Sequence, residues 1–256
     1  MTLEIFCWCD GFGFICFFVL VKIGFTMREI SCFLNAINDF GYVSYYRGHG
    51  DASWVLLPSI ARLESSNINK YRFVNWHVLE LYMMREFEKH GCSLLSSAPK
   101  NELEWLIHAQ HHGIPTRLLD WTTNPLKALF FAVENPNYDH VDGQLFGVSP
   151  VLNFVMERFV DTQKYDEIIG FHSSSLNSRV IAQEGCFTIH PLPNKWDSFP
   201  YISKESGTVE HLVSYVIPKE HKPALREQLK KLGITHKFMF PDLDGLAKSI
   251  VRDIGL

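Results

Sequence analysis

Asp120, Thr122 and Asn124 lie close together in the chain and are residue types that bind polar ligands. The apolar segment after them predicts a buried helix starting at Pro125, because proline suits the first helical position. A helix N-terminus leaves backbone N–H groups without helical partners and carries a partial positive charge, so anionic ligands favour it. These residues therefore indicate an anion-binding site. The alternative is that Thr122 and Asn124 only cap the helix.

The pattern around these residues predicts a helix, a strand, a cap and a second helix in succession. An amphipathic helix is expected over residues 100–112, because Gly113 stops it and Pro115 cannot continue it. Residues 116–121 are apolar and bounded by turn residues, which favours a short buried strand. The strand would carry Asp120 to the start of the second helix.

Four segments, taken together and in order, resemble the FRG domain family, which is named for an aromatic-Arg-Gly tripeptide. The tripeptide here is Tyr46-Arg47-Gly48. The segments are residues 45–62, the run Gln-His-His-Gly-Ile-Pro-Thr-Arg-Leu-Leu-Asp-Trp-Thr at 110–122, residues 177–190 with an Arg and a Gln-x-Gly-x-Phe element, and the closing segment 232–247. The resemblance implies an FRG domain over residues 27–256.

The layout of these segments more distantly resembles that of ADP-ribosyltransferases. That resemblance implies that Arg47 contacts a phosphate or ribose, and that Trp121 and Thr122 border a nicotinamide pocket. Gln183 or Glu184 would meet the reacting ribose. A carboxylate there would stabilise the developing oxocarbenium ion.

Site residues follow from both resemblances, with NAD as the implied cofactor and no metal expected. The residues implied as catalytic are Thr122, Gln183 and Glu184. Those implied in cofactor binding are Tyr46, Arg47, Gly48, Asp120, Trp121, Thr122, Asn124 and Arg179. The implied function is a nucleotide-binding cleft with ADP-ribosyltransferase-like transfer from NAD.

The residue types leave alternatives open at two of these positions. Arg47 presents a planar fork that suits a phosphate, but it could equally form a structural ion pair with Asp120, for which Arg117 competes. Glu184 would point away from Gln183 if both lie on one strand, because side chains alternate between its faces. That arrangement would leave nucleotide binding intact without transfer chemistry.

Two other functions remain as alternatives. A non-catalytic module could recognise a nucleotide or a nucleic-acid end through the same cleft. A metal-dependent hydrolase is a weaker alternative, since His108 and His112 have the spacing of a helical zinc pair while Ala109 occupies the place of the general-base glutamate.

Composition narrows the class of protein. The 256 residues carry a formal net charge of -4, which argues against a strongly basic clamp on nucleic acid. The six cysteines show no paired spacing, which favours free thiols in a reducing cytoplasm over a disulfide framework. The family resemblance suggests a bacterial or phage source with a defence or toxin role against an unknown protein or nucleic-acid target.

The N-terminal segment, residues 1–26, differs from the rest. Its apolar run at 11–21 lacks the preceding positive charge of a signal peptide and is shorter than the roughly 20 residues of a spanning helix. We expect a non-essential extension and no membrane contact.

The remaining hydrophobic patterns predict an α+β fold. Helices are expected over residues 27–41, 75–92, 152–161 and 223–232, and strands over 42–46, 144–148, part of 179–190, 209–217 and 237–240. This irregular order predicts a single compact domain of short mixed or antiparallel strands, with flanking helices around a central cleft.

Overall fold

A computed structural model of the chain describes residues 29–63, 68, 72–95, 97–155, 160, 166–173, 177–196, 199–203 and 209–254. The prediction for residues 1–26 lies outside these ranges.

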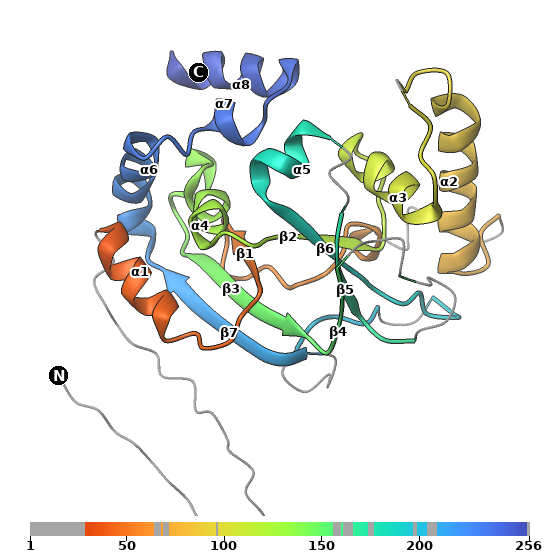
Figure 1. Ribbon diagram of the computed structural model, residues 1–256, viewed down its shortest axis with the longest axis horizontal. Helices are drawn as coiled ribbons and strands as arrows, with labels where there is room; N and C mark the ends of the chain where they lie inside the picture. The colour runs from red at the N-terminus through yellow and green to blue at the C-terminus, as the bar shows by residue number, and fades with distance from the viewer. Residues whose placement is uncertain are drawn as a thin grey trace, which may run out of the picture.

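Seven strands form one mixed sheet in the order β4-β5-β6-β2-β1-β3-β7 (Figure 1). The strands are β1 Tyr45–His49, β2 Leu118–Thr122, β3 Gly143–Pro150, β4 Leu152–Phe154, β5 Ile169–His172, β6 Gly185–Ile189 and β7 Val209–Ile217. Strands β4 and β5 are parallel, and the other neighbouring pairs are antiparallel. The sheet is continuous, but β1 and β2 at its centre share only the pair Tyr46 and Thr122.

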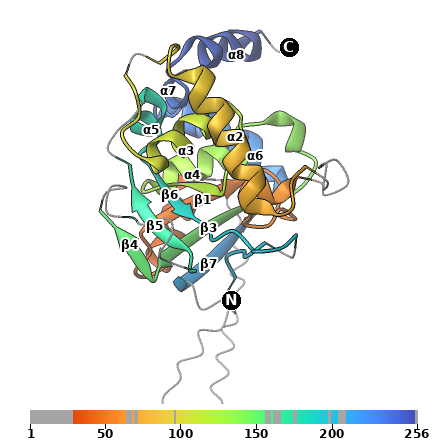
Figure 2. The same cartoon turned by 90° about the vertical axis from the view of Figure 1, so that its right-hand side faces the viewer.

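Helices cover the two halves of this sheet separately. They are α1 Ile30–Asn38, α2 Trp76–Gly91, α3 Glu102–His111, α4 Pro125–Val133, α5 Ser178–Gln183, α6 Lys222–Lys231, α7 His236–Met239 and α8 Leu243–Asp253, with 3-10 helices η1 Ile60–Arg62, η2 Pro136–Tyr138 and η4 Lys219–His221. Helices α7 and α8 lie at the end of the molecule opposite β4 (Figure 1, Figure 2). Within the described ranges, no helix combines the length and the apolarity needed to cross a membrane.

Two hydrophobic clusters hold the helices on the sheet. In one, Phe33 of α1, Leu129 of α4 and Leu225 of α6 pack with residues of β1, β3 and β7. In the other, Leu106 of α3 packs with Leu118 of β2 and with residues of β5 and β6. Burying one such side chain contributes roughly 1.5–3 kcal/mol. The two helical layers are therefore anchored independently, on either side of the β1–β2 junction.

A third cluster contains the other face of β2. Leu119 and Trp121 pack there with Tyr45 and Val148, whereas Leu118 belongs to the cluster under α3. This follows the two-residue alternation of a strand. The same alternation directs Asp120 toward the side of α3.

Helix α4 lies directly on β1 because Gly48 has no side chain. A Cβ on Gly48 would stand 1.9 Å from the Ala128 carbonyl oxygen and 2.7 Å from the Ala132 nitrogen. The glycine of the aromatic-Arg-Gly tripeptide thus admits the α4 backbone. Gly48, expected among the cofactor-binding residues, also lines the cleft.

The α+β prediction is confirmed, and two of its elements are wrong. Leu152–Phe154, expected to start a helix, forms strand β4 beside β5, since a short apolar run does not distinguish the two. Residues 156–159 and 161 of that expected helix lie outside the described part of the chain. His236–Met239, expected as a strand, is helix α7, whose N-cap Thr235 accepts from the Phe238 N–H.

Two boundaries also differ near the expected site residues. Strand β1 starts at Tyr45, so Arg47 lies inside the strand and not at its end. Gln183 closes α5, and Glu184 adopts a left-handed conformation with φ of 47° before β6 begins. The expected strand through both residues is therefore a helix followed by a turn.

Candidate functional site: a cleft where two central strands separate

A cleft of about 540 Å³ opens where β1 and β2 diverge. Continuing the register from Tyr46 and Thr122 would pair Gly48 with Asp120. Instead, the Arg47 guanidinium reaches β2, and its Nη1 donates to the Asp120 carbonyl oxygen at 2.5 Å. An arginine side chain thus satisfies a backbone acceptor that strand pairing leaves open.

Arg47 also determines the protonation state of His49, which lies two residues further along β1. Its Nε donates to His49 Nε2 at 3.0 Å, so that nitrogen carries no proton. Burial, followed by the charge of Arg47, lowers the pKa of His49 to about 3. Burial also lowers the pKa of Arg47 to about 10, opposed by the nearby charge of Asp120. At neutral pH the arginine is therefore charged and the histidine is neutral.

The Asp120 carboxylate lies on the floor of the cleft, reachable by solvent but surrounded by protein on most sides. Gln110 Nε2 donates to its Oδ1 at 2.6 Å. Thr116 Oγ1 in turn contacts Gln110 Oε1. Burial raises the pKa of Asp120, while the charge of Arg47 and the Gln110 hydrogen bond oppose the rise. The carboxylate is held by the Gln110 side chain and by its own backbone N–H, and it lines the cleft.

A second arginine at the cleft, Arg62, was not singled out from the sequence. Its Nε and Nη2 donate to the Leu57 carbonyl oxygen at 3.1 and 2.6 Å. Arg62 lines the same cleft as Arg47, and its positive charge adds to burial in lowering the pKa of Arg47, while Asp120 raises it. The signal available was its position as the last residue of segment 45–62.

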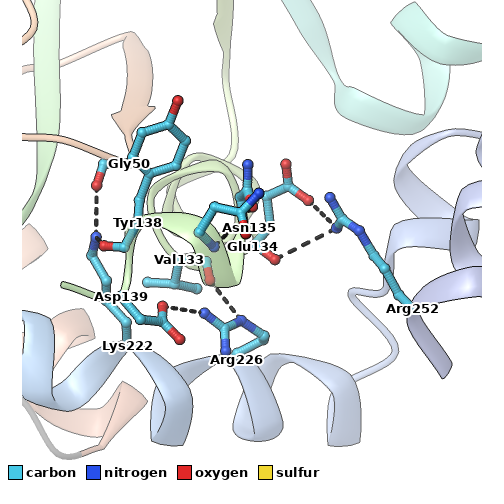
Figure 3. Close-up of polar contacts among 10 residues, drawn as sticks. Gly50, Val133, Glu134, Asn135, Tyr138, Asp139, Lys222, Arg226 and Arg252 are labelled. Atoms are coloured by element: carbon cyan, nitrogen blue, oxygen red, sulfur yellow. Dashed lines mark hydrogen bonds and ion pairs between the residues drawn. The ribbon is translucent and has the colours of Figure 1, made fainter. Parts of the chain in front are cut away.

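The wall opposite α3 is formed by the C-terminal end of α4 and the turn after it. Phe131, Glu134, Asn135 and Tyr138 line the cleft there. Figure 3 shows the basic side chains behind this wall. Lys222 Nζ donates to the carbonyl oxygens of Gly50 and Tyr138 at 2.6 and 2.7 Å.

Two arginines complete the support of that wall. Arg226 donates to the Val133 carbonyl oxygen at 2.7 Å and to Asp139 Oδ1 at 2.5 Å. Arg252 of α8 contacts both the carbonyl and the carboxylate of Glu134 (Figure 3). Positive charges near these carbonyl oxygens stabilise α4, because the C-terminal end of a helix carries a partial negative charge. They fix the backbone that carries the cleft wall.

The structure brings most of the expected site residues together. Eight of them line the cleft: Tyr46, Arg47, Gly48, Asp120, Trp121, Thr122, Arg179 and Gln183. The Trp121 ring itself is buried in the cluster on the other face of β2, where Nε1 donates to Thr188 Oγ1 at 2.9 Å. Trp121 therefore supports the floor of the cleft, while Asp120 faces it.

Several of these side chains already have protein partners. Thr122 Oγ1 donates to the Gln183 carbonyl oxygen at 2.6 Å, and Gln183 Nε2 donates to the Met239 carbonyl oxygen at 3.1 Å. Arg179 Nε donates to Asp242 Oδ2 at 2.7 Å, and its guanidinium lies over the Phe240 ring. These contacts join α5 to β2 and to the α7–α8 segment.

Glu184 and Asn124 are not among the residues that line the cleft, in contrast to the expectation for both. Glu184 Oε1 lies 2.8 Å from Lys127 Nζ and 3.3 Å from Asn124 Nδ2, and the ion pair with Lys127 lowers the pKa of Glu184. Asn124 Oδ1 caps α4 by accepting from the Leu126 N–H. The Glu184 carboxylate therefore lies beside the first turn of α4, paired with the side chains of Lys127 and Asn124.

The expected side-chain ion pair between Arg47 and Asp120 does not form, because the Arg47 guanidinium meets the backbone carbonyl. Arg117 does not compete for that carboxylate either. Its Nε lies 3.1 Å from Glu80 Oε2, and the two side chains are buried together. Arg117 belongs to the packing between α2 and β2.

Of the three histidines near the end of α3, only His111 lines the cleft. His108 and His112 lie elsewhere, and the His112 ring packs near Phe87. Among the described residues, no three His, Cys, Asp or Glu side chains gather as a metal site would require.

Comparison with known proteins finds a match for the middle of the chain. Residues 43–140 match the FRG domain family, so the chain contains an FRG domain. The matched region contains Arg47, Arg62, Gln110 and Asp120, and it ends before α5 and β6. No curated protein and no solved structure matches the chain.

Proposed function

We propose that the cleft binds a nucleotide through its phosphate groups, with NAD as the first ligand to test. The observation that carries the proposal is that two arginines, Arg47 and Arg62, line one concave site. The guanidinium fork suits phosphate oxygens, because two parallel N–H groups can donate to them.

The charge balance of the cleft supports an anionic ligand. Arg179 is paired with Asp242 and Glu134 with Arg252, so these residues add little net charge. Asp120 is then the single carboxylate, among the described lining residues, that opposes Arg47 and Arg62. A phosphate would offset the remaining positive charge in a place partly shielded from water.

Donor groups remain available for that phosphate. Arg47 uses Nε and one bond from Nη1 within the protein, and its Nη2 donates to no described residue. Arg62 likewise leaves Nη1 without a partner in the described ranges. Tyr46 also lines the cleft, and no hydrogen bond joins its hydroxyl to another described residue. These groups can meet a ligand without breaking existing contacts.

The size and lining of the cleft suit a base as well. A volume of about 540 Å³ lies within the range of roughly 300–1,000 Å³ typical of ligand pockets. Trp54 and Tyr138 line one part of the cleft, and Phe131 and Phe240 line another. Aromatic rings provide faces and edges on which bases pack.

ADP-ribosyl transfer from NAD is the finer form of this proposal. Transfer needs a negative charge near the reacting ribose. Because Glu184 is paired with Lys127 outside the cleft, Asp120 is the carboxylate that could serve. Nucleotide binding is therefore the part that the geometry supports best, and transfer depends on Asp120.

The test is titration calorimetry of the full chain with NAD and ADP-ribose. We expect both to bind, and Arg62→Gln to weaken binding about tenfold or more, since a hydrogen bond to a charged group contributes roughly 1.5–3 kcal/mol. Arg62 is exposed, so the melting temperature of the Arg62→Gln variant should hardly differ from that of the unaltered protein. Arg85→Gln, an exposed arginine on α2, is the matched control and should bind as the unaltered protein does. Absence of nucleotide binding, or equal binding by Arg62→Gln, would contradict the proposal.

A further inference from the structure

We infer that Asp120 recognises the vicinal hydroxyl groups of a ribose whose phosphate lies on Arg47 and Arg62, and that Gln110 is its positioning residue. The inference rests on the proposed nucleotide binding and adds the part of the nucleotide that is selected. It begins from a chain of three hydrogen-bonded side chains beneath the cleft.

Thr116 is the fixed end of that chain. It is fully buried, and its backbone N–H donates to Ser59 Oγ at 3.0 Å. Its carbonyl oxygen accepts from the Ile60 N–H at 3.1 Å. Because both backbone groups are tied to the segment around η1, the hydroxyl has a defined place from which to reach Gln110.

The Thr116 hydroxyl and the Asp120 carboxylate hold the two ends of the Gln110 amide. The carboxylate only accepts, so it takes Nε2 and thereby orients the amide, while the Thr116 hydroxyl accepts from the Leu118 N–H at 3.3 Å and donates to Oε1. Turning the amide over would place Oε1 against the carboxylate, two acceptors facing each other. Gln110 therefore holds one oxygen of the carboxylate through a donor and leaves other acceptor positions open to the cleft.

An ionised carboxylate accepts hydrogen bonds at about four lone-pair positions, of which Gln110 uses one and the Asp120 backbone N–H a second. No other described side chain donates to Asp120. The carboxylate therefore suits a ligand that carries two donors side by side, as a 2′,3′-diol does. An acidic residue that accepts from a ribose hydroxyl is also a known means of nucleotide recognition in other folds.

The neighbouring arginines specify where the phosphate must be. Asp120 repels a phosphate, while the adjacent Arg47 and Arg62 attract one. A ligand that satisfies all three carries hydroxyl groups and a phosphate within one sugar unit of each other. Ribose 5′-phosphates have this chemistry, whereas 2′-deoxyribose or 3′-deoxyribose phosphates lack one donor. A phosphate placed on the diol itself would meet the carboxylate.

The experiment compares four probes by calorimetry on the full chain: ADP, 2′-deoxyADP, 3′-deoxyADP and inorganic pyrophosphate. We expect ADP to bind at least about tenfold more tightly than either deoxy analogue, since a site built for a hydroxyl rejects the analogue lacking it. Asp120→Asn should remove most of this preference and leave pyrophosphate binding equal or tighter. Arg62→Gln should weaken all four probes and keep the preference.

Positioning by Gln110 is tested through Thr116, away from the ligand. Thr116→Val keeps the buried shape and removes the hydroxyl, so Gln110 Oε1 loses its partner and the amide is held in place less firmly. The ratio of ADP to deoxyADP affinity should fall, and Thr116→Ser should restore it. A purely structural effect would lower all affinities together and leave the ratio unchanged.

The outcomes separate the two proposals. If neither ADP nor pyrophosphate binds, the proposed nucleotide binding fails. If both bind, but ADP and the deoxy analogues are equal or Asp120→Asn keeps the preference, diol recognition by Asp120 fails and nucleotide binding stands.

Discussion

The two ends of α4 carry opposite partial charges, and each is compensated by side chains of the opposite sign. The C-terminal end lies at the cleft. At the N-terminal end, Glu184 and Asn124 supply oxygen atoms to the positive end of the helix dipole. At the C-terminal end, Arg226 and Arg252 donate to carbonyl oxygens that have no helical partner. Each end is thus satisfied from within the protein.

This difference between the two ends of α4 determines which residues around the helix can contact a ligand. A helix N-terminus favours an anion near its free N–H groups. In this chain the Glu184 carboxylate lies beside the first turn of α4, and the cleft instead adjoins Glu134, Asn135 and Tyr138 at the other end. A ligand would therefore meet side chains from β1, β2 and η1 in place of the free N–H groups of α4.

The largest expected loss of stability comes from Gly48 of β1, which contacts the middle of α4. Gly48→Ala would place a Cβ 1.9 Å from the Ala128 carbonyl oxygen, so the backbone of α4 must move. We expect a loss of at least about 3 kcal/mol in the free energy of unfolding, because backbone cannot yield as a side chain does. Urea unfolding of the full chain measures this loss.

Gly50→Ala is the matched control for that substitution. Its Cβ would stand 3.3 Å from Tyr138 Cδ2, a side-chain atom that can shift. The cost should stay near 1 kcal/mol. Equal losses for the two variants would mean that α4 does not depend on the close approach at Gly48.

Sequence patterns predicted the elements α3, β2 and α4, which carry Gln110, Asp120 and Asn124, for physical reasons. Local signals decide it: Gly113 has φ of 85° at the end of α3, and Asn124 with Pro125 starts α4. The two-residue alternation of β2 then separates Asp120 from Trp121. These signals depend on neighbouring residues alone.

The rest of the site depends on contacts that no local pattern contains. Gln183 and Glu184 were expected on a strand, but a left-handed residue at Glu184 ends α5 and turns its carboxylate to Lys127. Arg226 and Arg252 reach α4 from segments about 90 and 120 residues away. Apolar spacing reports a helix face and gives no information on which distant carbonyl a cation will meet.

Removing the cation at the C-terminal end should have an intermediate effect. Arg226→Met keeps the length of the side chain and loses the hydrogen bonds to Val133 and Asp139. Because the guanidinium is partly exposed, we expect a loss of about 2 kcal/mol, or a melting temperature lower by roughly 4–8 °C. Nucleotide affinity should also fall, since the cleft wall is loosened.

Lys231→Met serves as the control for the loss of a positive charge from α6, since Lys231 is an exposed residue at the end of that helix. It should leave both measurements unchanged. If Arg226→Met loses stability but binds nucleotide normally, the C-terminal end of α4 does not shape the binding site.

The smallest expected effect lies at the N-terminal end, where Glu184→Gln removes the carboxylate and keeps the shape. The Glu184 side chain is 48% exposed, so screening by solvent limits the ion pair with Lys127 to about 1 kcal/mol or less. Lys127 lowers the pKa of Glu184 in the folded state. The ion pair therefore contributes fully to the free energy of unfolding above the unfolded-state pKa of about 4.3. It is lost as the pH falls through the lower pKa of the folded state.

The stability difference between the unaltered protein and Glu184→Gln should therefore be largest near neutral pH and shrink below about pH 4, with Glu210→Gln, an exposed glutamate on β7, as the control. Thermal melts across this pH range measure it. NAD affinity, measured beside the melts, should remain unchanged, because Glu184 does not line the cleft. A large loss of NAD binding without loss of stability would instead return Glu184 to the ligand site, and the distinction between the two ends of α4 would fail.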